Sequence, residues 1–257
     1  MKKFITAIAA GLLLVSLAAS AKKAKVVINT ASDLNGKTVG CQAGTTGEIW
    51  LNEEAKNVKV KSFKTGIDAA MALKNGSLDA VVLDEIPAKE IVKKNKKLRI
   101  VETSFAAEEY AIAVRKGDSA LLDSINKTVK AMKADGTYEK LLAAFIPADG
   151  EIKLPATIQT SGSKTVKVGC SADFPPFEYI DAKDPVGFDI TLCQMIARDM
   201  GAKLEVVNMD FGGLIAALQS GAIDMIASGM TATEDRRKNV DFSDTYFKTN
   251  QVIIVRK

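Results

Sequence analysis

Two charged residues of this chain could hold the two ends of a free amino acid. Arg236 has a planar guanidinium that can bind a carboxylate through two parallel hydrogen bonds. Asp84 directly follows an apolar run, where a carboxylate needs a cationic partner such as an ammonium group. Each has a plainer interpretation: the basic run at 236–238 is typical of a solvated helix face, and Asp84 with Glu85 is typical of a helix N-terminus.

Polar and aromatic residues elsewhere in the chain could complete such a site. Thr231 and the amide after Gly229 could add hydrogen-bond donors for the carboxylate, and Phe174 and Phe211 could close over the ligand side chain. The alternatives stay open, because the 174–177 segment is also a rigid proline turn with core aromatics, and the threonines at 45 and 46 could simply cap a helix.

A degenerate internal repeat predicts how these residues are positioned. Residues 37–43 are echoed by 166–172, each a short strand ending in small polar residues, and residues 72–81 are echoed by 217–226. In the second pair an apolar-spaced helix stops at a glycine and a buried strand follows. Two copies favour two similar α/β lobes, with the ligand beyond the carboxyl ends of the strands.

The rest of the chain fits this plan. Apolar spacing predicts a helix over 119–133 and another over 138–145. Residues 147–164 are rich in Pro, Gly, Ser and Thr without a sustained period, which predicts a linker.

Composition narrows the class of function. The chain has 257 residues, 47% of them hydrophobic, which is enough for two modest domains. It contains no histidine, so most metalloenzyme and Ser-His mechanisms are disfavoured. The formal charge of +4 is too balanced to suggest a nucleic-acid partner. We therefore expect a small-molecule ligand.

The first 21 residues are typical of a secretory signal. Two lysines precede an apolar run that ends in Ala19-Ser20-Ala21, which predicts cleavage after Ala21 and a periplasmic protein. A membrane anchor is the alternative, although the run is shorter than the roughly 20 residues that span a bilayer. Cys41, Cys170 and Cys193 form no metal motif, and we expect small buried side chains rather than a Cys41–Cys170 disulfide.

Longer motifs carry a resemblance to a known family. The landmarks are VGCSADFPPFEYID, PVGFDITLCQMIARDMG, MDFGGLIAALQSGAIDMIASGMTATEDRRKNVDFSDTYF, DLNGKTVGCQAGTTGE, GSLDAVVLDE and ADGTYEKLL. Over nearly all of 26–146 and 164–257 the chain resembles the polar amino-acid substrate-binding proteins of ABC importers, which include the glutamine-, histidine- and lysine/arginine/ornithine-binding proteins. The resemblance implies an α/β fold, the two-lobed type II periplasmic binding protein fold.

The order of the motifs differs from that family. Its chains begin with the VGCSADFPPFEY part and have DLNGKTVG after FSDTYF, whereas DLNGKTVG lies near the front here. We therefore expect a circular permutation, with the usual ends joined through 147–164 and new ends near Lys25 and Lys257. This order predicts one lobe over 25–110, a hinge strand over 111–116 as the sole continuous crossing, and the other lobe over 115–257.

The resemblance also implies a ligand-binding set. Its members are Gln42, Thr45, Thr46, Asp84, Ser171, Asp173, Phe174, Phe211, Ser228, Gly229, Thr231 and Arg236. Several relatives have Asp at the position of Ser171, whereas this chain has Asp173 two residues later. Gln42 would suit a polar ligand side chain, and Asp173 or Glu178 would suit arginine or lysine.

The function expected from these features is a monomeric periplasmic receptor. It would bind a polar L-amino acid, with glutamine or a basic amino acid favoured, and deliver it to an ABC-type membrane permease, using no metal, cofactor or catalytic residue. One alternative is a lyase or dehydratase on the same fold, with Asp173, Glu178 or Asp84 as acid or base. A soluble amino-acid sensor is another.

Overall fold

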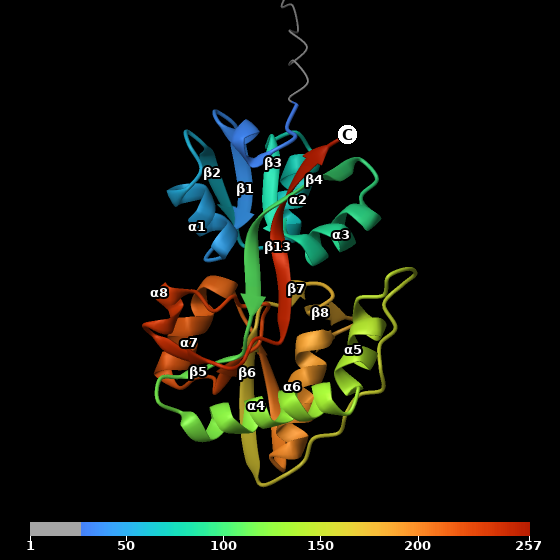
Figure 1. Cartoon of the computed structure of the whole chain (residues 1–257), viewed down its shortest axis with the longest axis vertical. Helices are drawn as coiled ribbons and strands as arrows, with labels where there is room; N and C mark the ends of the chain where they lie inside the picture. The colour runs from blue at the N-terminus through green and yellow to red at the C-terminus, as the bar shows by residue number, and fades with distance from the viewer. Residues whose placement is uncertain (1–26) are drawn as a thin grey trace, which may run out of the picture.

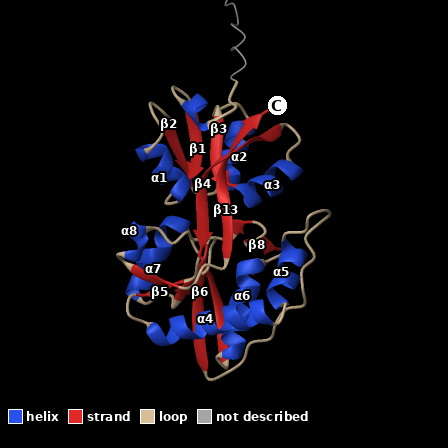
Figure 2. Cartoon of the chain, in the orientation of Figure 1, coloured by secondary structure: helices blue, strands red, loops and turns tan. Residues whose placement is uncertain are grey.

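The computed structural model describes residues 27–257, which form two lobes, each built on a five-stranded sheet with helices on its faces (Figure 1). The signal segment expected at residues 1–21 lies outside the described residues. The parallel strands of both sheets run toward the middle of the molecule, where the lobes meet (Figure 2), whereas β13 (Phe247–Arg256) and β5 (Ala113–Arg115) run the opposite way. No helix in residues 27–257 has the length and apolar character needed to cross a membrane.

The N-lobe is the lobe whose sheet has the order β2-β1-β3-β13-β4. Strands β1, β2 and β3 are parallel, and β13 pairs antiparallel with both β3 and β4. Its elements are η1 (Ala31–Leu34), β1 (Thr38–Gln42), α1 (Thr46–Glu53), β2 (Lys59–Phe63), α2 (Gly66–Lys74), β3 (Ala80–Asp84), α3 (Glu85–Lys94), β4 (Leu98–Tyr110) and β13 (Phe247–Arg256).

The C-lobe is the lobe whose sheet has the order β10-β6-β11-β5-β12, with a small sheet β7-β8-β9 beside it. Its first elements are β5 (Ala113–Arg115), α4 (Ser119–Ala134), α5 (Thr137–Phe145), β6 (Lys164–Cys170), β7 (Asp173–Phe174), β8 (Glu178–Asp181) and β9 (Asp184–Val186). These are followed by α6 (Phe188–Asp199), β10 (Ala202–Asn208), η2 (Phe211–Gly213), α7 (Leu214–Ser220), β11 (Met225–Ile226), α8 (Glu234–Arg237) and β12 (Val240–Phe242).

The internal repeat is confirmed as structure. In the N-lobe α2 is capped by Thr65, ends before Gly76 in a positive-φ conformation, and leads into the fully buried β3. In the C-lobe α7 ends at Gly221, also at positive φ, and leads into the buried β11. The predicted helices at 119–133 and 138–145 correspond to α4 and α5, and 147–163 contains no helix or strand.

The predicted division into two contiguous lobes is wrong at the C-terminal strand. Residues 251–254 of β13 pair with β3, so the last strand lies inside the N-lobe sheet rather than in a C-lobe over 115–257. The chain also crosses between the lobes twice, along β4 into β5 and from β12 into β13, so the segment at 111–116 is not the sole crossing. The reason is a long-range antiparallel pairing of β13 with β3 and β4, which sequence order does not reveal.

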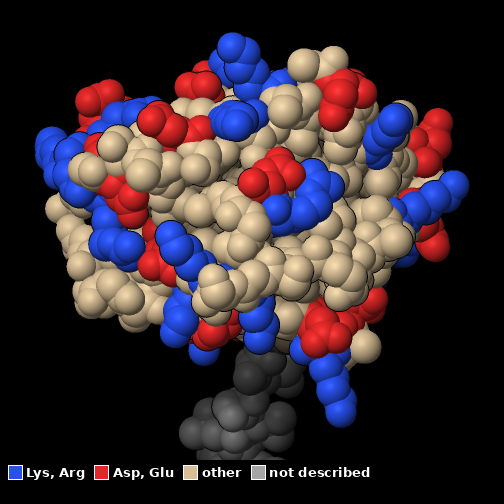
Figure 3. Space-filling model, turned by 90° about the horizontal axis from the view of Figure 1, so that it is seen from below, with Lys and Arg blue, Asp and Glu red and all other residues tan. Residues whose placement is uncertain are grey.

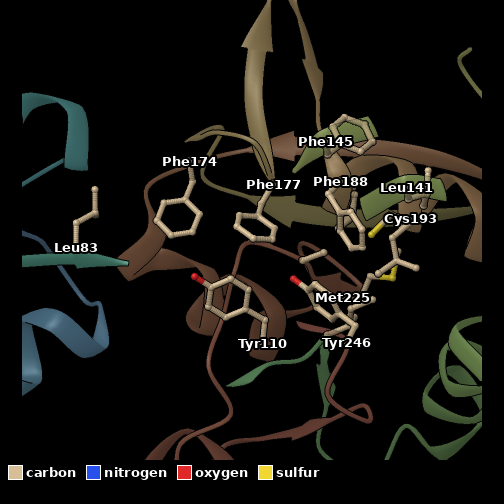
Figure 4. Packing of buried hydrophobic residues seen from close by; sticks show 14 of the residues in the cluster. Leu83, Tyr110, Leu141, Phe145, Phe174, Phe177, Phe188, Cys193, Met225 and Tyr246 are labelled. Carbon is tan, nitrogen blue, oxygen red and sulfur yellow. The ribbon is translucent and has the colours of Figure 1, made fainter. Parts of the chain in front are cut away.

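An aromatic cluster belongs to a buried core that contains residues of both lobes (Figure 4). The ring of Tyr110 meets that of Phe177 edge to face with centroids 5.2 Å apart, and Phe188 stacks on Tyr246 at 6.0 Å. The three cysteines are buried free thiols, as expected for small core side chains. On the face shown in Figure 3, basic and acidic side chains are interspersed.

Candidate functional site

A cavity lies between the lobes. All twelve residues predicted for the ligand site line it, and Glu178 is the thirteenth lining residue. Gln42 and Asp84 end β1 and β3 of the N-lobe, while Ser171 and Ser228 directly follow β6 and β11 of the C-lobe. The carboxyl ends of the repeated strands therefore face one another across the cavity, as expected for α/β lobes.

Arg236 is a buried cation without a carboxylate within ion-pairing distance in the described part of the chain. Its side chain is 7% exposed, and its Nη1 and Nη2 donate to the carbonyl oxygens of Thr231 and Gly44 at 2.8 and 2.9 Å. The ring of Phe211 lies 5.4 Å from the guanidinium carbon. Burial lowers the pKa of Arg236, an effect opposed by the charges of Glu108 and Asp84. The site thus holds a desolvated positive charge that a ligand anion would pair.

Asp84 provides the opposite charge from the N-lobe. The residue is buried, and its carboxyl group accepts hydrogen bonds from the Tyr110 hydroxyl and the Gln251 amide. Asp84 stands at the N-cap position of α3 with Glu85 in the first turn, as the helix N-terminus interpretation expects, and its side chain makes no capping hydrogen bond. Burial and the neighbouring Glu108 raise the pKa of Asp84 to about 7.

Glu108 and Gln251 belong to this charged region and were not predicted. The Gln251 amide nitrogen donates to Glu108 Oε1 at 3.1 Å and also to Asp84, so it links the two acids. Thr231 donates its hydroxyl proton to Glu108, which couples the C-lobe loop to β4. Both residues lie on the crossing strands β4 and β13, and Gln251 pairs with Asp84 at the end of β3. Other polar residues occur in both strands, so the sequence alone does not single these two out.

A second polar group lies at another part of the cavity wall. Asp173 accepts from the Ser171 hydroxyl at 2.8 Å and from the Gln42 amide at 3.4 to 3.5 Å, and the latter contact crosses from one lobe to the other. Burial is the main reason that the pKa of Asp173 is raised, and the hydrogen bonds from Ser171 and Gln42 oppose the rise. Asp173 thus places a carboxylate beside Ser171 in the cavity wall.

Aromatic rings form the apolar part of the wall. Phe174 and Phe211 are both buried and line the cavity. Phe174 packs over Gly229, where a Cβ would lie 2.6 Å from the ring, and Gly229 has φ of +50°. Only glycine fits this backbone position without strain or displacement of the ring.

The polar groups of Ser228 and Gly229 are already hydrogen-bonded within the protein. Ser228 Oγ accepts from the Ser171 amide at 2.9 Å and donates to Glu178 at 2.7 Å. The Gly229 amide donates to Asp189 at 2.9 Å. These two residues therefore shape the cavity wall, while Arg236 carries its positive charge.

Thr45 and Thr46 lie at the start of a helix and also line the cavity, so both interpretations of these threonines hold. Thr45 Oγ1 accepts from the Glu48 amide at 3.4 Å as the N-cap of α1, and it donates to the Gln42 carbonyl at 2.8 Å. The Thr46 hydroxyl accepts from Gln251 at 3.4 Å. The same threonines that begin α1 thus form part of the N-lobe wall.

The lobes touch around the cavity. The Arg236 hydrogen bond to Gly44 joins α8 to the N-lobe, and Lys64 forms an ion pair with Asp210 at 2.8 Å. The backbones of Gly44 and Gly212 lie so close that a Cβ on Gly44 would come within 2.9 Å of the Gly212 Cα. This is the arrangement of two lobes closed over a cavity.

Comparisons with known proteins agree with this architecture. The model of the bacterial extracellular solute-binding proteins, family 3, matches residues 21–148 and 166–257. The arginine-binding extracellular protein ArtP of Bacillus subtilis (strain 168) is 46% identical over 97 residues, covering 38% of each chain. The L-cystine-binding protein TcyJ of Escherichia coli (strain K12) is 35% identical over 123 residues, covering 48% of this chain and 46% of that protein.

Solved structures give similar partial matches. The arginine-bound form of domain 1 from TmArgBP is 48% identical and covers 36% of this chain and 80% of that chain, with a TM-score of 0.33. An ancestral arginine-binding protein bound to arginine is 50% identical over 35% of this chain and 39% of that chain, with a TM-score of 0.32. The matches span less than half the length of the two curated relatives named above. Because the family model matches most of the residues in two segments, this chain belongs to the bacterial extracellular solute-binding proteins, family 3.

Proposed function

We propose that this protein is a receptor that binds a free L-amino acid with a cationic side chain, arginine being the best match, and delivers it to an ABC-type permease. The observation that carries the proposal is the pairing of two buried, opposite charges in one cavity, Arg236 for the ligand carboxylate and Asp84 for the ligand ammonium. Each charge would gain its missing partner from the ligand.

The balance of charge favours a basic ligand side chain. The site contains three acidic side chains, Asp84, Glu108 and Asp173. Arg236 is the one buried cation of this region in the described chain. An amino acid with a cationic side chain adds one net positive charge, whereas glutamine adds none. Phe174 and Phe211 would pack on the aliphatic part of the side chain, with Asp173 pairing its charged end. The arginine-binding relatives point the same way.

Glutamine is the second candidate. The Gln42 amide and the Asp173 carboxylate together offer a donor and an acceptor, which is what a ligand amide requires. One curated relative is a glutamine-binding protein of Bacillus subtilis, and one ancestral arginine-binding protein was solved with glutamine.

Membership of a solute-binding family supports binding rather than turnover, so we propose no catalytic role for Asp84, Asp173 or Glu178. It also supports an extracytoplasmic location. Cleavage of the signal segment after Ala21 is part of the proposal on the sequence pattern alone. The expected monomer remains part of the proposal.

The motif order leads us to propose that the chain is circularly permuted. The two segments matched by the family model lie on either side of residues 149–165, which contain little regular structure. Ile28 packs in the same core cluster as Ile253 and Val255, and the Lys257 amide donates to the Lys97 carbonyl, so the proposed new ends lie close together. A chain re-cut within 149–163, with Lys257 joined to residue 27, should fold and bind the same amino acid. Failure to fold would contradict a simple permutation.

Thermal unfolding in the presence of each of the twenty amino acids tests the function. A ligand bound only by the folded chain raises the melting temperature by an amount that grows with the logarithm of its affinity, so L-arginine should produce the largest rise. Agmatine, which is arginine without its carboxylate, is the matched control and should produce little. A rise with glutamine but not arginine would reject the cationic ligand, and no rise with any amino acid would reject the receptor.

A further inference from the structure

Two buried carboxyl groups, one of them on the cavity-lining Glu178, each have one oxygen without a hydrogen-bond partner. Glu178, on β8, and Asp189, on α6, are both fully buried. Glu178 Oε2 and Asp189 Oδ1 have no hydrogen-bond partner among the described residues when both acids are ionised, and the other oxygens of the two groups bind the adjacent residues Ser228 and Gly229. Two ionised carboxylates have no proton to donate, so one of the two acids must carry a proton for either orphaned oxygen to gain a bond from the other.

We propose that Glu178 and Asp189 share one proton at neutral pH, carried by Glu178, and that this pair positions the Ser228–Gly229 turn in the cavity wall. The proton satisfies both orphaned oxygens and leaves one negative charge instead of two in a site without water-exposed surface.

The hydrogen bonds assign the proton to Glu178. Asp189 Oδ2 accepts from the Gly229 amide at 2.9 Å and from the Tyr246 hydroxyl at 2.6 Å, and both bonds stabilise the ionised form. Glu178 accepts a single bond, from the Ser228 hydroxyl at 2.7 Å. Asp189 is therefore the better anion of the two.

The surroundings hold the proton in place. Burial raises the pKa of Glu178 well above its usual range, and it raises the pKa of Asp189 to about 6. The titratable groups that face the pair are acidic or neutral: Asp84 from β3, Asp173 from β7, Cys170 from β6, Cys193 from α6, Tyr138 from α5, and Tyr246 ahead of β13. None of these groups supplies a positive charge that would favour loss of the proton.

Glu178 and Asp189 are connected to the cavity wall through hydrogen bonds to two adjacent residues, Ser228 and Gly229. Glu178 fixes the Ser228 side chain, which in turn accepts from the Ser171 amide at the end of β6. Asp189 fixes the Gly229 amide, next to the ring of Phe174. Glu178 is thus a positioning residue, and its effect on the ligand rests on the proposed function, whereas the shared proton does not.

Infrared spectroscopy of the ligand-free chain tests the proton directly. At about pH 8, one unit above the pKa of Asp84, the wild-type chain should show the carbonyl band of a protonated carboxylic acid, and Glu178→Gln should lack it. Asp181→Asn, an exposed carboxyl at the end of the same strand, is the matched control and should keep the band. A wild-type chain without the band would overturn the proposal even if Glu178→Gln did not fold.

The pH dependence of unfolding is the second readout. An acid whose pKa is raised in the folded state loses its proton on unfolding, so stability falls as pH rises between its unfolded and folded pKa values. Above about pH 7.5 the wild-type chain should release about one proton more on unfolding than Glu178→Gln, whose amide can still donate to Asp189 and accept from Ser228. Equal proton release by the two chains would reject the assignment. Neither measurement uses a ligand, so failure of the proposed function would leave both outcomes unchanged.

Discussion

The two lobes share one interior design and differ where their strands end. In the N-lobe Asp79 accepts from the Thr38 amide at 2.9 Å, and its own amide donates back to the Thr38 carbonyl at 2.8 Å. In the C-lobe Asp224 makes the same two bonds with Lys167, at 2.9 and 2.8 Å. Each aspartate thus fixes the start of its central strand relative to the next strand of the sheet.

A glycine pair extends this similarity. A Cβ at Gly40 in β1 would lie 2.5 Å from Leu78 Cδ1, and a Cβ at Gly169 in β6 would lie 2.4 Å from Ile223 Cδ1. In both lobes the strand is therefore covered by an aliphatic side chain from the turn that precedes the next buried strand.

The strand ends have no such similarity. The N-lobe ends β3 with the acid Asp84, whereas the C-lobe places the guanidinium of Arg236 beyond β11. The repeated interior thus builds two equivalent platforms, and the residues after the strands set the charge of each. A dipolar ligand can then be held with one end on each lobe.

The largest effect is expected when the positive charge that the C-lobe contributes to the cavity is removed. Arg236→Ala should weaken amino-acid binding at least about thirtyfold, because the ligand carboxylate would be buried without its partner. Titration calorimetry measures the change. Arg237→Ala, an exposed arginine of the same helix, is the matched control and should bind nearly as the wild type does.

The negative charge that the N-lobe contributes, on Asp84, depends on pH. Since the pKa of Asp84 in the ligand-free chain is raised to about 7, lowering the pH further protonates it and removes its attraction for the ligand ammonium. Affinity should therefore fall up to about tenfold per pH unit below 7. The same titrations at several pH values test this. Asp84→Asn should bind weakly at all of them, and an affinity that rises on acidification would contradict the assigned role.

The shared interior predicts equal costs for a matched pair of substitutions. Gly40→Ala and Gly169→Ala should each destabilise the chain by about 1–3 kcal/mol, because each added methyl overlaps a buried aliphatic side chain. Denaturant unfolding measures both. Gly213→Ala, where a Cβ meets nothing within 4 Å, should cost little. A large cost in only one lobe would argue against equivalent interiors.

The smallest expected effect is the difference in stability cost between substitutions of Asp79 and of Asp224. Asp224 also pairs with Arg115 Nη2 at 3.2 Å, and the described chain shows no ion pair for Asp79. Asparagine retains an oxygen for the strand amide in both cases, so Asp224→Asn should cost more than Asp79→Asn by no more than about 1 kcal/mol, the usual range for a partly exposed pair. Adding Arg115→Ala should remove the difference between them.

The fold class and the residues of the cavity wall could be predicted from the sequence because both follow local rules. Apolar spacing with a glycine stop identified α2 and α7, and the strand-end rule then selected Gln42, Asp84 and Ser171, which line one cavity. Their contact with a ligand remains a prediction.

The parts that escaped prediction depend on long-range pairing. Glu108 and Gln251 meet because β4 and β13 lie side by side, although 143 positions separate them in sequence. The Glu178–Asp189 pair likewise depends on how β8 packs against α6. A contiguous reading of the sequence placed β13 in the wrong lobe for the same reason.

The interior position of β13 has a consequence for synthesis. Because β13 lies between β3 and β4, those two strands have no partner on their facing edges until residues 247–256 have been made. The whole C-lobe is synthesised in that interval, which lasts several seconds or more at about 5–20 residues per second. The lobe made first is therefore the lobe finished last, with two exposed edges for another chain or a chaperone to bind meanwhile.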